Sequence, residues 1–117
     1  MTNAQVVRTF EILVERNIGS DRLFEQYIYL SIEKNVFKYS PELYVRTVRA
    51  LADKCYYEDP VFWQEYMLKY LNHDRNGNPG IRQFSSSDAK MVWEALAFLK
   101  FKVPQVDLKD YVSYVED

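Results

Sequence analysis

Residues 40–54 read SPELYVRTVRALADK and carry the start signals and the apolar side of one amphipathic helix. Ser40 is a favoured N-cap residue, Pro41 suits the first helical position, and Glu42 complements the positive end of the helix dipole. The apolar residues that follow recur three or four positions apart, which predicts a buried side made of Leu43, Tyr44, Val48, Leu51 and Ala52. This stretch therefore predicts a helix that ends near residue 54.

The same pattern recurs along the chain at long intervals. Val7-Arg8-Thr9 lies 38 positions before Val45-Arg46-Thr47, and Leu51 lies 45 positions before Leu96. Intervals of this size in a helical sequence are typical of α-hairpin solenoids, in which each unit buries its apolar face only against its neighbours. Such arrays bind other molecules more often than they transform them, so the pattern favours a binding function.

The spacing of apolar and capping residues predicts an all-α chain that forms a single domain over residues 1–117. About six helices are expected, as three antiparallel hairpins stacked into a short solenoid-like array, because short connections force consecutive helices to run antiparallel. The hairpins are expected over about residues 4–35, 40–72 and 85–116. In the second helix of the first two hairpins, the expected buried positions are Leu23, Phe24, Tyr27 and Ile28, and then Val61, Phe62, Tyr66, Met67, Tyr70 and Leu71.

Residues 73–84 are rich in turn formers and are expected to form a loop. Asp74-x-Asn76-x-Asn78 resembles the start of a calcium-binding loop, but such a loop needs Gly at its sixth position and Glu at its twelfth. Pro79 and Ser85 stand there instead. We therefore expect a surface loop without a metal ion, followed by a helix that Ser85 caps.

The composition narrows the possible function. Apolar residues make up 48% of the 117 residues, which excludes a disordered chain, and three Gly and four Pro are too few for many β-hairpins. A net charge of −2 gives no overall cationic field for nucleic acid. The first 30 residues carry seven charged side chains, so no secretory signal is expected and the chain is expected to be intracellular.

No catalytic constellation is expected. His73 and Cys55 are the only histidine and the only cysteine, and neither belongs to a nucleophile motif or a metal-ligand spacing. A lone cysteine near a helix end is more often a small core residue. We therefore predict no enzyme activity, no cofactor and no small-molecule substrate.

Aromatic residues are in excess, at 16% of the chain. Tyr and Trp side chains that fall away from the apolar stripes are typical of protein interfaces, because they combine a large apolar area with a polar tip. The expected interface residues are Tyr29, Tyr39, Tyr56, Tyr57, Trp63, Tyr111 and Tyr114. This favours a protein–protein interaction scaffold, and apolar ends of the array would favour a homodimer.

The alternative is a single-stranded RNA-binding protein of an organelle. Exposed aromatic rings stack on unpaired bases, and Arg46 and Arg49 would contact the phosphates. Acidic residues such as Glu42 and Asp53 lie among these cations, however, which is typical of a solvated helix surface. We therefore expect proteins as partners before RNA.

The phrases Val45-Arg46-Thr47-Val48-Arg49-Ala50-Leu51-Ala52 and Ala95-Leu96-Ala97-Phe98-Leu99 resemble organellar α-hairpin repeat proteins of the heptatricopeptide, pentatricopeptide and tetratricopeptide-like class. The signature string of tetratricopeptide repeats does not occur, and the interval exceeds 34 residues. A narrower resemblance is to membrane-anchored mitochondrial scaffolds of trypanosomatids. This resemblance implies mitochondrial association, self-association and an N-terminal membrane anchor removed from this chain.

Overall fold

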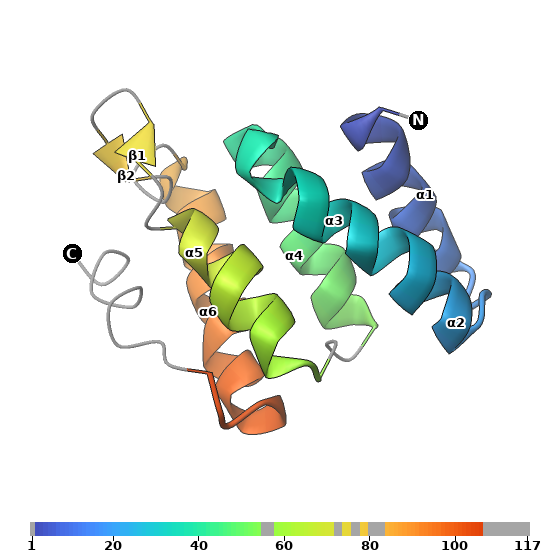
Figure 1. Ribbon diagram of the computed structural model, residues 1–117. Coiled ribbons are helices and arrows are strands. Elements are labelled where there is room, and N and C mark those ends of the chain that lie inside the picture. Colours follow the sequence, from blue (N-terminus) through green and yellow to red (C-terminus); the bar gives the residue numbers. More distant parts are fainter. Residues whose placement is uncertain (1, 55–57, 72–73, 76–77, 80–83, 107–117) are drawn as a thin grey trace.

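The computed structural model describes residues 2–54, 58–71, 74–75, 78–79 and 84–106 (Figure 1). These residues are all-α apart from β1 (Asp74–Arg75) and β2 (Asn78–Pro79), two short strands that pair antiparallel within the expected loop. The helices are α1 (Asn3–Glu15), α2 (Asp21–Leu23), α3 (Tyr29–Asn35), α4 (Pro41–Asp53), α5 (Leu68–Leu71) and α6 (Ser86–Lys102). A π-helical turn, Phe24–Ile28, joins α2 to α3, and a second, Phe62–Met67, leads into α5.

The packing places α4 between α1 and α6, while α3 lies against the π-helical turn Phe62–Met67 (Figure 1). A 3-10 turn, Val36–Lys38, follows α3 and also contacts that π-helical turn. The core runs through all of these contacts as one cluster of apolar side chains.

Four of the described helices, α1, α2, α4 and α6, begin with the same kind of cap. The hydroxyl of Thr2 accepts a hydrogen bond from the Gln5 amide at 3.1 Å, and the hydroxyl of Ser40 accepts one from the Leu43 amide at 3.2 Å. Ser85 caps α6 in the same way, which confirms the caps predicted at Ser40 and Ser85. The α1 and α4 helices contain 13 residues each, and their caps stand 38 positions apart.

The turn after α1 needs unusual backbone angles. Asn17 has φ 52° and Gly19 has φ 101°, which places both in the region that glycine tolerates best. A Cβ atom at Gly19 would lie 3.1 Å from Cε2 of the Phe24 ring. This turn ends α1 and leads into α2, whose cap is Ser20.

The two π-helical turns begin at Phe24 and Phe62, 38 positions apart. Within each turn an amide donates to the carbonyl five residues earlier: Tyr29 to Phe24, and Leu68 to Trp63. A π-helical turn holds more residues than an α-helical turn, so it changes which positions face the core. A strict α-helical period therefore mispredicts side-chain directions around both turns.

The consequences appear at four positions. Tyr27 and Val61, which the α-helical period assigns to the core, are 66% and 59% exposed. Tyr29 and Trp63, which it assigns to the surface, are buried. At Tyr27, Tyr29 and Trp63 the predicted stripes are wrong because the wider turn rotates the residues that follow its start. Val61 precedes the second turn, so this rotation does not explain its exposure.

Tyrosines join the second helical pair. The rings of Tyr44 and Tyr70 stack with centroids 4.2 Å apart and planes 5° apart. The Tyr44 hydroxyl donates to the Met67 carbonyl at 2.6 Å, and the Tyr70 hydroxyl donates to the Tyr39 carbonyl at 2.8 Å. Both bonds satisfy buried backbone oxygens and fix α4 against the helix that contains α5.

The last described segment closes the core beside α6. Val103 and Val106 are buried, and the Lys100 ammonium donates to the carbonyls of Pro104 (2.7 Å) and Val106 (2.5 Å). The sixth expected helix, over 106–116, lies outside the described residues except for Val106.

Candidate protein-interaction surfaces

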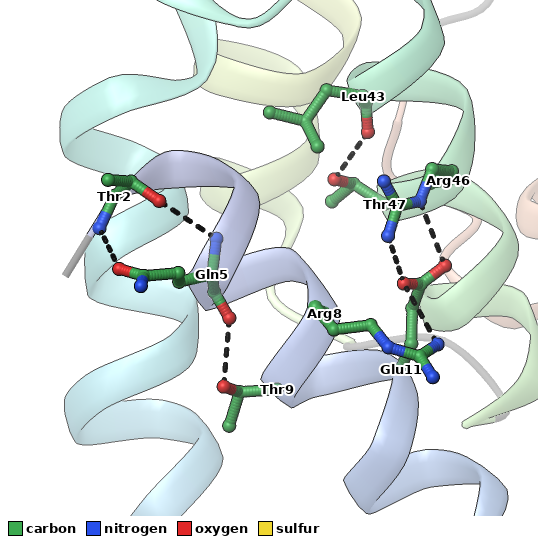
Figure 2. Close-up of polar contacts among 8 residues, drawn as sticks. All are labelled: Thr2, Gln5, Arg8, Thr9, Glu11, Leu43, Arg46 and Thr47. Carbon is green, nitrogen blue, oxygen red and sulfur yellow. Dashed lines mark hydrogen bonds and ion pairs between the residues drawn. The ribbon is translucent and has the colours of Figure 1, made fainter.

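An ion pair that joins α1 to α4 lines a groove between these two helices, and Figure 2 shows the pair. Arg46 on α4 donates to Glu11 on α1 through two nitrogens: Nη2 lies 2.6 Å from Oε1, and Nε lies 3.2 Å from Oε2. The Arg46 and Glu11 side chains are 34% and 23% exposed. The hydrogen bond that Arg46 donates to Glu11 raises the pKa of Arg46, with partial burial acting in the opposite direction.

The groove is polar and its charges are balanced. It has a volume of about 380 Å³. Arg8 also approaches Glu11, at 3.9 Å, so one carboxylate serves two guanidinium groups. The charged residues that line the groove are Arg8, Arg46, Arg49, Glu11, Glu15 and Asp53. Because acids stand beside each cation, the groove suits a polar peptide segment better than a run of phosphates.

Large apolar side chains lie exposed on the other helices. Phe98 and Phe101 on α6 are 65% and 83% exposed, and Tyr27 and Leu30 share the outer side of the helix formed by α2 and α3. Exposed apolar patches mark interaction sites on soluble proteins, whereas single apolar residues need no explanation. The two aromatic rings on one side of α6 are therefore the clearest candidate contact surface.

None of the predicted interface aromatics lies on a surface that the structure describes. Tyr29, Tyr39 and Trp63 are buried in the core, so the expectation that they are exposed is wrong. Tyr29 and Trp63 turn inward through the π-helical turns, and the carbonyl of Tyr39 accepts a hydrogen bond from the Tyr70 hydroxyl. The remaining candidates lie outside the described residues: Tyr56, Tyr57, Tyr111 and Tyr114.

The Tyr39 side chain is a buried phenol. Burial raises the pKa of its hydroxyl to about 12. That hydroxyl has no hydrogen-bond partner among the described residues. Its backbone is bonded at both groups: the amide donates to the Val36 carbonyl at 3.0 Å, and the carbonyl accepts from the Tyr70 hydroxyl. Tyr39 thus acts as a large apolar core residue.

The two predicted RNA-contacting arginines lie in different surroundings. Arg46 is held by Glu11, while Arg49 is exposed at the edge of the same groove. A phosphate would have to displace a carboxylate to bind Arg46. Sequence reasoning missed this ion pair because Glu11 and Arg46 stand 35 positions apart.

Sequence reasoning also missed Phe98 and Phe101 as surface residues. A signal was present: the apolar residues of α6 lie around the whole helix, whereas those of α4 lie on one side. A helix that is apolar all round is normally covered on every side. In α6 the outer side carries the exposed rings of Phe98 and Phe101.

The described residues contain no group of three His, Cys, Asp or Glu side chains placed to hold a metal ion. His73 and Cys55 lie outside them, as do the side chains of the Asp74–Asn78 stretch. None of the described helices is both long enough and apolar enough to cross a lipid bilayer. Comparison of the chain with protein-family models, with curated proteins and with solved structures gives no match.

Proposed function

We propose that the protein is a non-enzymatic scaffold, built from helical-hairpin repeats, that binds other proteins and pairs with a second copy of itself. The observation that carries this proposal is the pair of exposed rings, Phe98 and Phe101, on α6. Water contact with rings of this size is unfavourable, by roughly 25 cal/mol for each Å² of apolar surface. A protein partner that covers them removes that cost.

The repeat architecture is supported by details that recur at one interval. The caps Thr2 and Ser40 and the π-helical turns that begin at Phe24 and Phe62 are each 38 positions apart. Thr9 and Thr47 keep the same interval, and each hydroxyl donates to the carbonyl four residues earlier, at 2.8 Å and 2.9 Å (Figure 2). Two hairpins with the same local geometry favour an array in which the third begins at the Ser85 cap.

Affinity capture with chemical cross-linking tests the scaffold function. We expect the full chain to retain specific proteins that cross-link to α6, and we expect Phe101→Glu to lose them. Tyr27→Glu is the control, because Tyr27 is also an exposed aromatic residue but lies on the helix formed by α2 and α3. A capture in which the wild type and Phe101→Glu retain the same proteins would count against the proposal.

The RNA alternative has its own test. Binding of mixed single-stranded RNA that uses Arg49 and neighbouring cations should weaken steeply as salt rises, because counterions are released from the phosphates. Saturable binding at low salt that Arg49→Gln abolishes would favour RNA over a protein partner. The Arg46–Glu11 ion pair and the acids around the groove argue for the opposite result.

Mitochondrial association, implied by the resemblance to organellar repeat proteins, stays a prediction. Fractionation of cells that express the tagged full-length protein tests it directly.

A further inference from the structure

The inner side of α6 is fully used by the fold. Val92, Leu96 and Leu99 are buried against the rest of the core. The helix packs on α4 with this side. The outer side therefore has no role in the described core, although it carries the most exposed aromatic ring, Phe101 at 83%.

The outer residues of α6 form one continuous stripe. Glu94, Phe98 and Phe101 stand four and then three positions apart, which places them on one side of an α-helix. Ala97 is exposed beside them, and Lys102 is exposed at the end of the helix. We call this stripe the outer α6 face: Glu94, Ala97, Phe98, Phe101 and Lys102.

The chain leaves α6 on the opposite side. Val103 follows the buried positions of the helix, and both Val103 and Val106 are buried. The Lys100 ammonium holds this turn through its bonds to the Pro104 and Val106 carbonyls. From Val103 to Val106 the described backbone thus lies against the core, while Phe101 is 83% exposed.

We propose that the outer α6 face is the homodimer interface, formed by antiparallel pairing of α6 with α6 of a second copy. This interface rests on the self-association proposed above. It specifies the surface at which the two copies meet and the residues that lie opposite one another. Phe98 would lie on the two-fold axis. Glu94 and Lys102 each stand four positions from Phe98, so antiparallel pairing places Glu94 opposite the partner's Lys102 on both sides of the axis.

This charge pattern selects a second copy over an unrelated partner. Two identical helices centred on Phe98 bring opposite charges together at both ends, and small Ala97 allows the helices to approach closely. Parallel pairing would set like charges side by side. The contact involves one helix from each subunit, so it is small, and we expect a dissociation constant on the order of micromolar.

Sedimentation equilibrium of the full chain, from about 1 to about 300 µM, tests the proposal. We expect a reversible dimer for the wild type and at least about 10-fold weaker association for Phe98→Glu. Tyr27→Glu should pair like the wild type, because Tyr27 is equally exposed (66% against 65%) but lies away from α6. If the wild type dimerises and Phe98→Glu dimerises equally well, the outer α6 face is not the interface. Self-association would then still hold, through another surface.

Charge reversal tests the register without removing a ring. Glu94→Lys and Lys102→Glu should each weaken the dimer, since each sets like charges opposite one another, and the double variant should restore it. A double variant that is weaker than both single variants overturns the register.

A monomeric wild type at every concentration overturns the interface. The scaffold function would still be decided separately, by affinity capture.

Discussion

The guanidinium of Arg46 and the carboxylate of Glu11 join α4 to α1 through two hydrogen bonds, 2.6 Å and 3.2 Å long. The pair links α1 and α4, the helices that begin at the Thr2 and Ser40 caps. Because both side chains are partly exposed, water and salt reduce its contribution to stability.

A double-mutant cycle measures this contribution. With Glu11→Gln and Arg46→Gln, we expect a coupling free energy of about 1 kcal/mol that decreases as salt is added. The control is Glu65–Lys69, a more exposed pair at 3.5 Å within one helix. Its coupling should be about 0.3 kcal/mol. Equal coupling free energies in the two pairs would contradict the expectation that the less exposed, two-bond Glu11–Arg46 pair is the stronger one.

Removing the hydroxyl of Tyr70 should change the free energy of unfolding differently from removing that of Tyr39. Tyr70→Phe leaves the buried Tyr39 carbonyl without its donor and should cost about 1–3 kcal/mol in the free energy of unfolding. Tyr39→Phe removes a buried hydroxyl that has no partner among the described residues, so it should be neutral or stabilising. Chemical denaturation of both variants checks this, and the reverse order of stability would refute it.

Thr47 should tolerate valine. Its hydroxyl donates to the Leu43 carbonyl of the same helix. At the matching position of α6, 45 residues later, a valine, Val92, is buried in its place. We expect Thr47→Val to change the free energy of unfolding by less than about 1 kcal/mol. Thr47→Ala should cost more, because it also removes a buried methyl group. A loss above about 2 kcal/mol for the valine variant would show that the hydroxyl is needed.

Glu33 should make the protein less stable as pH rises. Partial burial, followed by repulsion from Asp59, raises its pKa above the ordinary 4.5. The folded state therefore binds a proton more tightly than the unfolded state, so stability falls as pH rises from about 4.5 through the raised pKa. Glu33→Gln should flatten this slope and raise the melting temperature at neutral pH.

The matched control for Glu33 is Glu25→Gln, since Glu25 is exposed on the same continuous helix. Thermal melts between pH 4 and pH 7 are needed for both variants and the wild type. The explanation fails if Glu25→Gln flattens the slope as much as Glu33→Gln does.

The helix starts were predictable because capping is a local property. Ser40 and Ser85 bond to amides three residues away, so a short stretch of sequence contains the whole interaction. The all-α class was also predictable, from the apolar period over each long helix. The Glu11–Arg46 pair was not, because it depends on how α1 packs against α4.

The interface aromatics were mispredicted for a different physical reason. Tyr29 and Trp63 were placed outside the core with a period of 3.6 residues per turn, but each lies in or after a π-helical turn. The error recurs at both turns. The exposed rings of Phe98 and Phe101 were overlooked because α6 is apolar on both sides, which a single-stripe criterion does not detect.

Disulfide trapping across α6 tests the central claim most directly. With Cys55 replaced by serine, Glu94→Cys and Lys102→Cys chains are purified separately and then mixed under mild oxidation. Antiparallel pairing centred on Phe98 separates identical positions by about 12 Å along the helix, at 1.5 Å per residue, and sets the two different positions opposite each other. The account predicts rapid cross-linking only in the mixture. Equal cross-linking by either chain alone, or none in the mixture, would contradict it.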